Sequence, residues 1–199
     1  MLQNVAGISL CMIVKNEEEV IARCLDSVQD IVDEIVVVDT GSSDRTKEIV
    51  ARYTDNCYDF AWVNDFAAAR NYSFSLATQK YILWLDADDV ILESDKDQFL
   101  VLKNNLDCSV DSVIMPYHYA LNENGEVAVS LRRNRLVKRS RRFKWNGPVH
   151  EYLEVTGHII NSDITITHLR AKPTETSKSA ARGGYLIYEY ALTSIHYRY

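Results

Sequence analysis

Proline and glycine are scarce in this chain of 199 residues, and closely spaced pairs of cysteines are absent. With 3 Pro and 7 Gly, the sequence is neither collagen-like nor of low complexity. Its four cysteines, Cys11, Cys24, Cys57 and Cys108, include no C-x-x-C pair that would indicate a zinc site or a redox motif. We therefore expect buried free thiols in a protein of the reducing cytosol.

Long apolar runs are also absent. No run approaches the roughly 20 residues that a membrane-spanning helix needs, and no basic region precedes the short apolar stretch near the N-terminus. We expect neither a transmembrane segment nor a signal peptide, and hence a cytoplasmic protein.

Charge is distributed unevenly along the chain. The net charge is -6, but residues 1–111 carry 21 acidic and 9 basic side chains, whereas residues 112–199 carry 7 acidic and 13 basic ones. An acidic first half argues against a nucleic-acid-binding surface there and favours a site for a divalent cation.

The first half alternates short apolar runs rich in β-branched residues with helical patterns. This alternation predicts an α/β fold, a Rossmann-like and mostly parallel sheet with flanking helices. Asn16 and Glu19 resemble a capping box at the start of the first helix. The expected strands, each followed by a helix, are 8–14, 34–39, 57–60 and 81–85.

The second half has a different pattern, with consecutive β-rich runs. The sequence N-E-N-G at 122–125 is a hairpin-turn signal between the first two of them. We expect one domain made of residues 1–110 and a mixed, β-rich part at 111–175, followed by a C-terminal helix at 176–199. The expected β-rich runs are 112–121, 127–137, 149–155 and 164–168.

The strand expected at 81–85 runs directly into the acidic sequence D-A-D-D at 86–89. Ligands of open α/β sheets bind beyond the carboxyl ends of the strands, and Asp86 and Asp88 would lie about 6–7 Å apart in extended chain. Such carboxylates suit Mg²⁺ or Mn²⁺. The alternative is a solvated acidic turn, with Asp89 capping the next helix, but the buried strand just before the motif favours the cation site.

Four motifs follow one another along the first half of the chain. They are S-L-C-M-I-V-K-N-E-E at 9–18, E-I-V-V-V-D-T-G-S-S-D-R-T at 34–46, D-F-A-A-A-R-N at 65–71 and W-L-D-A-D-D at 84–89. Together they resemble the family 2 glycosyltransferases, which have the A-type nucleotide-sugar-binding fold. The resemblance implies transfer of a sugar from a nucleotide diphosphate sugar, usually a UDP-sugar, with inversion at the anomeric carbon. It makes 1–110 the nucleotide-sugar-binding half and 111–175 the acceptor side.

The resemblance implies roles for the donor-binding residues. Asp39 corresponds to the carboxylate that accepts a hydrogen bond from the nucleobase, and the backbone at Val14, Lys15 and Asn16 to the wall beside that base. Arg70 matches the arginine that approaches the diphosphate, whose oxygens suit a planar guanidinium. In isolation, Asp39 would be interpreted as a strand-end cap and Arg70 as a surface helix charge.

The resemblance also implies a metal site for Mn²⁺ or Mg²⁺. Asp88 would ligate the ion, and Asp86 would face the ribose or a metal-bound water. His168, at the end of I-T-I-T-H, matches the late histidine that completes the metal site in part of this fold group. A histidine at a strand end is otherwise a common structural residue.

The segment W-N-G-P-V-H-E at 145–151 resembles the sequence around the catalytic base of many relatives. Glu151 is then the candidate base that deprotonates the acceptor. His150 competes for the same role, and the alternative for Glu151 is a surface carboxylate on an edge strand.

A basic run without a single acidic residue precedes this segment. Nucleic-acid-binding sites normally add interleaved aromatic residues, so we expect no nucleic-acid partner here. The run is interpreted as a mobile loop over the diphosphate or an anionic acceptor, or else as a solvated hairpin face. Its members are Arg132, Arg133, Arg135, Lys138, Arg139, Arg141, Arg142 and Lys144.

Two other functions are compatible with an α/β sheet and paired carboxylates. A nucleotidyltransferase would normally have a Gly-rich phosphate loop, and the sequence K-N-E-E at 15–18 is not one. An inactive sugar-nucleotide-binding scaffold would not be expected to retain all the candidate residues. The expected acceptor is a glycan, a lipid-linked group or a peptide. Similar proteins often continue into a downstream helical domain.

Overall fold

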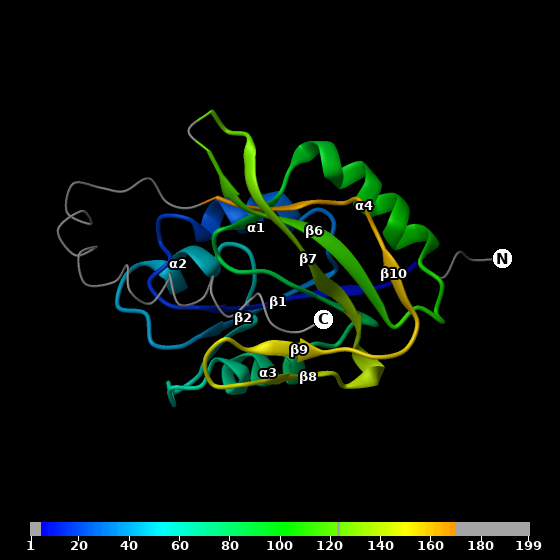
Figure 1. The fold of residues 1–199 in the computed structure, drawn as a ribbon. Coiled ribbons are helices and arrows are strands. Elements are labelled where there is room, and N and C mark those ends of the chain that lie inside the picture. Colours follow the sequence, from blue (N-terminus) through cyan, green and yellow to red (C-terminus); the bar gives the residue numbers. More distant parts are fainter. Residues whose placement is uncertain (1–4, 123, 170–199) are drawn as a thin grey trace. The chain divides into compact units, whose positions relative to one another are not determined.

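The computed structural model describes residues 5–122 and 124–169 (Figure 1). The helix expected at 176–199 and the last part of 111–175 lie outside the described residues. Helices and strands alternate in the first half of the described chain, and strands dominate the second half. No helix within the described ranges is long and apolar enough to cross a membrane.

The first half forms the parallel part of the sheet. Strands β1 (Ile8–Val14), β2 (Glu34–Asp39), β3 (Cys57–Asp59) and β4 (Tyr81–Trp84) lie in the order β3-β2-β1-β4, and every neighbouring pair is parallel. β1, β2 and β4 are buried along almost their whole length, which explains their continuous apolar runs. The predicted mostly parallel sheet is confirmed.

Helices connect these strands. In α1 the apolar residues spaced three and four apart, including Ile21, Leu25 and Val28, are fully buried against the sheet. The helix α3 begins after Asp65, whose side chain accepts a hydrogen bond from the Ala68 amide at 2.9 Å. The helices are α1 (Ile21–Val28), α2 (Thr46–Val50), α3 (Phe66–Leu76) and α4 (Glu93–Asn105).

The predicted capping box at the first helix is wrong. The helix α1 begins at Ile21, and its N-cap residue Val20 makes no side-chain capping bond. Asn16 instead has a left-handed backbone (φ 56°), and its side-chain oxygen accepts from the Ser43 amide at 2.8 Å. Asn16 therefore connects the loops that follow β1 and β2.

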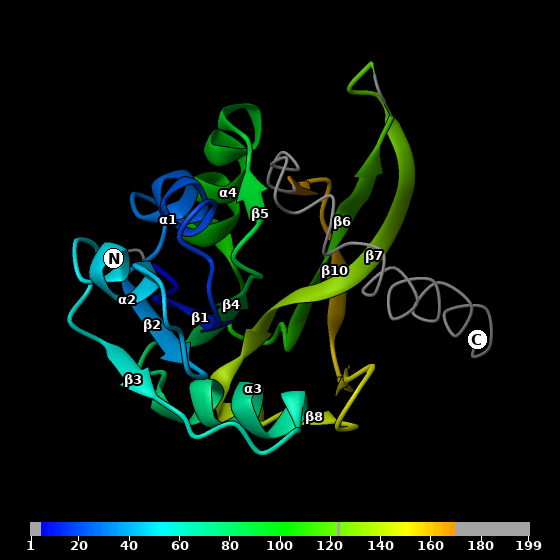
Figure 2. The same cartoon turned by 90° about the vertical axis from the view of Figure 1, so that its left-hand side faces the viewer.

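The second half extends the same sheet with mixed pairing. The order continues from β4 through β7 (Val127–Lys138), β6 (Ser112–Leu121) and β11 (Ile166–His168) to β5 (Asp89–Ile91). β6 and β7 form a long antiparallel hairpin, which Figure 2 shows extending beyond the rest of the sheet. Pairing of β11 with β5 is antiparallel, and with β6 it is parallel.

Three short strands were not expected from the sequence. β5 follows the acidic motif, β10 (Ile159–Asn161) pairs with β6, and β8 (Lys144–Asn146) pairs with β9 (Tyr152–Glu154) in a separate two-stranded sheet. Segments of three residues are too short to show a period. Consequently, the strand expected at 149–155 is present only as β9.

Two further expectations are wrong in part. Cys11 and Cys24 are buried free thiols, but Cys57 is half-buried and Cys108 is exposed. The basic run is largely regular structure instead of a mobile loop, because residues up to Lys138 belong to β7 and Arg139–Arg141 form a short 3-10 helix. Nor is the whole run solvated, since Arg135 is only 1% exposed.

Candidate active site

The parallel strands bring three loops to one edge of the sheet. Val14 is in register with Asp39 and Cys11 with Trp84, so the carboxyl ends of β1, β2 and β4 meet there. The ends of these strands and the loops that follow them carry Val14, Lys15, Asn16, Asp39 and Asp86, whereas Arg70 lies on α3. This is the edge at which open α/β sheets bind ligands.

Asp39 is the last residue of β2, and only one of its two carboxylate oxygens accepts hydrogen bonds from the described residues. The residue is 1% exposed, and Oδ1 accepts hydrogen bonds from the backbone amides of Gly41 and Ser42 at 2.9 and 2.8 Å. Oδ2 is buried and has no hydrogen-bond partner among residues 5–122 and 124–169. A buried acceptor of this kind is suited to a ligand N–H group.

The loop after β1 lies against the loop after β2. The carbonyl of Val14 accepts from the Thr40 amide at 2.9 Å, and the Asn16 amide donates to Ser42 Oγ at 2.9 Å. Lys15, between them, is exposed. The predicted wall at 14–16 and the predicted base-binding carboxylate of Asp39 are thus neighbours.

The acidic motif is a turn, so the extended arrangement expected for Asp86 and Asp88 is wrong. The Asp89 amide donates to the Asp86 carbonyl at 3.0 Å, and β5 then starts at Asp89. Asp89 does not cap the following helix, since Leu92 occupies the N-cap of α4. The turn separates the aspartates into two groups with different partners.

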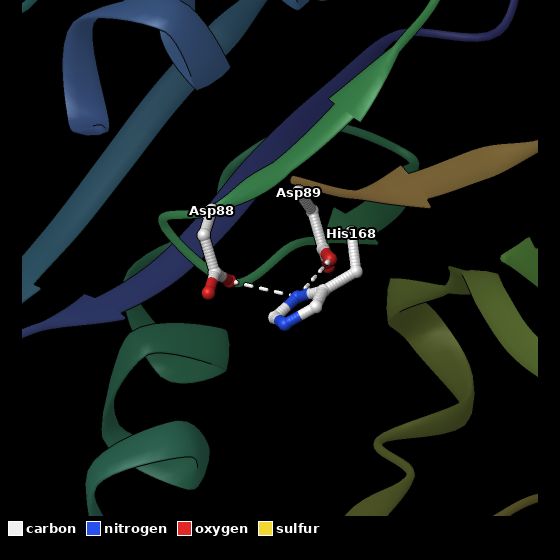
Figure 3. Close-up of side chains that lie close together, drawn as sticks. All are labelled: Asp88, Asp89 and His168. Atoms are coloured by element: carbon white, nitrogen blue, oxygen red, sulfur yellow. Dashed lines mark ion pairs between the residues drawn. The ribbon is translucent and has the colours of Figure 1, made fainter. Parts of the chain in front are cut away.

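The first group consists of Asp88, Asp89 and His168, drawn in Figure 3. Antiparallel pairing of β5 with β11 sets His168 opposite Asp89. His168 Nδ1 lies 3.2 Å from Asp88 Oδ1 and 3.7 Å from Asp89 Oδ1, and all three ligand atoms lie within 4.8 Å of one another. Two carboxylates and an imidazole form a donor set that fits Mn²⁺.

His168 is held in place by aromatic packing as well. The ring of Tyr119 stacks on its imidazole, with centroids 5.5 Å apart and planes 14° apart. Burial lowers the basicity of His168, but hydrogen bonds and charge from Asp88 and Asp89 raise its pKa to about 9. The ring must give up that proton before Nδ1 can bind a metal ion.

The second group is centred on Arg70, which joins Asp86 to Glu151. Arg70 Nη2 lies 2.7 Å from Asp86 Oδ1, and Arg70 Nε lies 2.8 Å from Glu151 Oε1. Desolvation opposes ionisation of Asp86, yet the charges of Arg70 and Arg135 hold its pKa below the usual range. The interpretation of Arg70 as a solvated surface charge is wrong, since its side chain is 10% exposed.

Aromatic residues and one asparagine fix the position of Arg70. Its guanidinium lies 5.2 Å from the ring centre of Trp84 and 4.8 Å from that of Trp145. The next residue, Asn71, accepts from the Trp145 amide and donates to the Trp145 carbonyl, both at 2.9 Å. These contacts hold β8, and with it the segment leading to Glu151, against α3.

The two candidates for the base differ in their surroundings. The Glu151 side chain is 15% exposed and faces Arg70, in the same group as Asp86. His150 is exposed and has a left-handed backbone with φ 58°. Glu151 is thus the one of the two that is joined to the predicted diphosphate arginine.

Three residues of this region were missed by the sequence analysis. Arg135 reaches the site from β7, with Nη1 2.9 Å from Asp89 Oδ2, and both side chains are fully buried. Asp89 was interpreted only as a helix cap. Glu17 has its pKa raised to about 7 by burial and by the nearby charges of Asp88 and Asp86. The excess of acidic residues in the first half of the sequence could have indicated that Glu17 lies in this region.

The amino-acid sequence that forms this site matches a known protein family. Residues 9–156 match the family described as Glycosyl transferase family 2. The chain belongs to this family. The matched region includes Asp39, Arg70, Asp86, Asp88 and Glu151, whereas His168 lies beyond its end.

Two curated relatives cover most of this chain. A TPR repeat-containing protein of Synechococcus elongatus is 38% identical over 150 residues, 75% of this chain and 36% of the relative. The SPbeta prophage-derived glycosyltransferase SunS of Bacillus subtilis is 33% identical over 144 residues, 70% of this chain and 33% of the relative. The aligned region thus spans about a third of each relative's length.

Among solved structures, glucosyl-3-phosphoglycerate synthase from Mycobacterium tuberculosis, in complex with Mn²⁺ and UDP-glucose, has a similar fold. The TM-score is 0.57 with 13% sequence identity, over 94% of this chain and 79% of that chain. The described residues therefore have the A-type glycosyltransferase fold, as the sequence predicted.

Proposed function

We propose that this protein transfers a sugar from a nucleoside diphosphate sugar to an acceptor, with assistance from a divalent metal ion and with inversion at the anomeric carbon. One observation carries the proposal. Arg70 is bound between Asp86 and Glu151, beside the Asp88, Asp89 and His168 group. The proximity of the candidate cation ligands, the candidate phosphate-binding arginine and the candidate base supports the proposal.

The donor would be bound at both ends of its nucleotide. Asp39 Oδ2 would accept from the ring N–H of uracil or guanine, and Arg70 would donate to the diphosphate. UDP is favoured by the family resemblance, and the mycobacterial structure of similar fold is a complex with UDP-glucose and Mn²⁺.

UDP with Mn²⁺ should raise the melting temperature by several degrees. Ligand at 100 times its dissociation constant adds about 2.7 kcal/mol of stability, and 1 kcal/mol shifts the melting temperature of a domain of this size by about 2–4 °C. Thermal denaturation with and without UDP, GDP and Mn²⁺ measures the shift. A flat response to every nucleotide with metal would contradict the proposal.

Asp39→Asn should weaken UDP binding about 10- to 100-fold, because it sets an amide N–H where an acceptor is needed. It retains one oxygen for the amides of Gly41 and Ser42, so the loop is preserved. The matched control is Asp59→Asn, an exposed position in register with Asp39 on β3. Equal UDP affinity in the two variants, measured by calorimetry, would remove Asp39 from the site.

The metal ion would be held by Asp88 and His168, with Asp89 as a third ligand and Asp86 close by. Bound there, it would offset the negative charge that grows on the departing diphosphate. Asp88→Asn should lower Mn²⁺ affinity at least about 100-fold, because the ion loses a charged carboxylate ligand. Electron paramagnetic resonance of free Mn²⁺ measures this, with the exposed Asp97→Asn as the control. Unchanged Mn²⁺ affinity in Asp88→Asn would exclude the site.

His168→Ala distinguishes an imidazole ligand from a structural histidine. An imidazole favours the softer Mn²⁺ over Mg²⁺, so this variant should lose more affinity for Mn²⁺ than for Mg²⁺. Unchanged affinity for both ions, in the same binding assay, would leave His168 without a ligand role.

In the chemical step, Glu151 would accept the proton of the acceptor nucleophile. The nucleophile would form a bond to the anomeric carbon as the bond from that carbon to the β-phosphate oxygen breaks, releasing the nucleoside diphosphate. One displacement inverts the anomeric configuration. Since Arg70 engages Glu151 Oε1, the other carboxylate oxygen would take the proton.

The whole protein's acceptor and setting are further proposals. A glycan, a lipid-linked group and a peptide all present a nucleophile of the required kind. A cytoplasmic location is consistent with the free, reduced cysteines. A downstream helical domain is consistent with the greater length of the relatives. A nucleotidyltransferase is disfavoured because K-N-E-E follows β1 where a Gly-rich loop would be needed.

A further inference from the structure

A groove of about 540 Å³ lies outside the candidate active site. It runs between the second half of α3, the first half of β4 and the segment from the end of β7 to β8, elements labelled in Figure 2. We name it the α3–β7 groove. None of Asp39, Arg70, Asp86, Asp88, Glu151 and His168 lines it.

The floor of the α3–β7 groove is apolar. Ala77, Ile82 and Val137 are buried at its base, and the half-buried rings of Phe74 and Phe143 pack against the same cluster. A concave apolar surface of this volume lies within the range of sites that bind small organic ligands. The floor alone does not determine what kind of molecule would bind.

The rim of the groove determines its charge preference. Four cations line it, namely Lys138, Arg139, Arg142 and Lys144, and no acidic residue is among the residues that line it. Among the described residues, no carboxylate forms an ion pair with Arg139, Arg142 or Lys144. These cations belong to the basic run that the active site leaves unused, apart from Arg135.

We propose that the α3–β7 groove binds an amphiphilic anion, a phosphate or carboxylate that carries a hydrocarbon body. The hydrocarbon would cover the apolar floor, and the anionic group would meet the guanidinium of Arg142 and the ammonium of Lys144. Such a molecule could come from a bilayer or be free in solution. In either case the two parts of the ligand match the two parts of the groove.

The test is binding of decyl phosphate below its micellar concentration, measured by calorimetry on the full chain. Wild-type protein should bind decyl phosphate at least tenfold more tightly than inorganic phosphate or decanol, since each of these offers half of the required chemistry. Binding of decyl phosphate no tighter than of inorganic phosphate would overturn the proposal.

Two variants separate this groove from general charge attraction. R142E/K144E should weaken decyl phosphate binding at least tenfold, whereas R52E/R132E, which makes the same charge change at exposed positions outside the groove, should change it less than about twofold. S75W would fill the groove without altering charge and should also abolish binding. Equal affinity in wild type and S75W, or equal losses in the two double variants, would refute the assignment.

A second arm identifies the source of the ligand. Sedimentation with phosphatidylglycerol vesicles that is lost in both R142E/K144E and S75W would assign the groove to a bilayer lipid. Decyl phosphate binding without vesicle binding would assign it to a free amphiphile. Vesicle binding that survives both variants, with no decyl phosphate binding, would contradict the groove as the site.

Discussion

Glu151→Gln should lower the turnover number about 10²- to 10⁴-fold, the range that a general base contributes. Glutamine cannot take a proton at neutral pH. It can still accept from Arg70 Nε, which lies 2.8 Å from the present carboxylate. We therefore expect UDP affinity to be retained and the free energy of unfolding to fall by only about 1 kcal/mol.

The neighbouring residue supplies the control for this variant. His150→Asn should retain most activity, because His150 is exposed whereas Glu151 is joined to Arg70. Steady-state kinetics and a nucleotide-binding isotherm on both variants separate turnover from donor binding. An active Glu151→Gln beside an inactive His150→Asn would move the base to His150.

Arg135→Met should lower the free energy of unfolding by about 3–5 kcal/mol, because it removes the arginine charge that is paired with the buried carboxylate of Asp89. The Arg135 and Asp89 side chains are 1% and 0% exposed, and they lie 2.9 Å apart. The guanidinium also lies 3.9 Å from the centre of the Trp84 ring and 4.3 Å from that of Tyr117. Methionine retains packing volume but replaces neither the charge nor these contacts.

Denaturant unfolding monitored by circular dichroism measures this effect. Arg132→Met on the same strand is the matched control, since Arg132 is half-exposed and 3.8 Å from an exposed Asp163. It should cost less than about 1 kcal/mol. Similar losses in both variants would show that burial of the Arg135 pair has no special role in stability.

The parallel half of the fold was predictable because its signals are local. Ile8–Val14 and Glu34–Asp39 are apolar runs ending in polar loops, and their positions agree with the structure. The strand end also indicated the acidic motif at 86–89, since open α/β sheets bind ligands at the carboxyl ends of their strands, whereas the role of Asp39 came from the family resemblance. Those inferences required no knowledge of distant pairing.

The rest of the site depends on contacts between distant segments. Arg135 and Asp89 are 46 positions apart in the sequence but form an ion pair. His168 lies beside Asp89 only because β11 pairs with β5. Nothing in the basic run distinguishes the buried Arg135 from its exposed neighbours Arg133 and Arg132. Likewise, the family resemblance indicated Arg70, but its two carboxylate partners come from separate loops. Such pairings are set by sheet register, which the local pattern does not reveal.

The proposed sugar transfer breaks the bond between the anomeric carbon and the diphosphate. Phosphorus NMR of UDP-sugars and GDP-sugars incubated with the protein and Mn²⁺ tests it most directly, with water as the acceptor where no other is known. We expect release of a nucleoside diphosphate that requires Mn²⁺ and is lost in Asp88→Asn. Release of a nucleoside monophosphate with a sugar phosphate would instead place cleavage between the phosphates, and that result, or no release from any donor, would contradict the account.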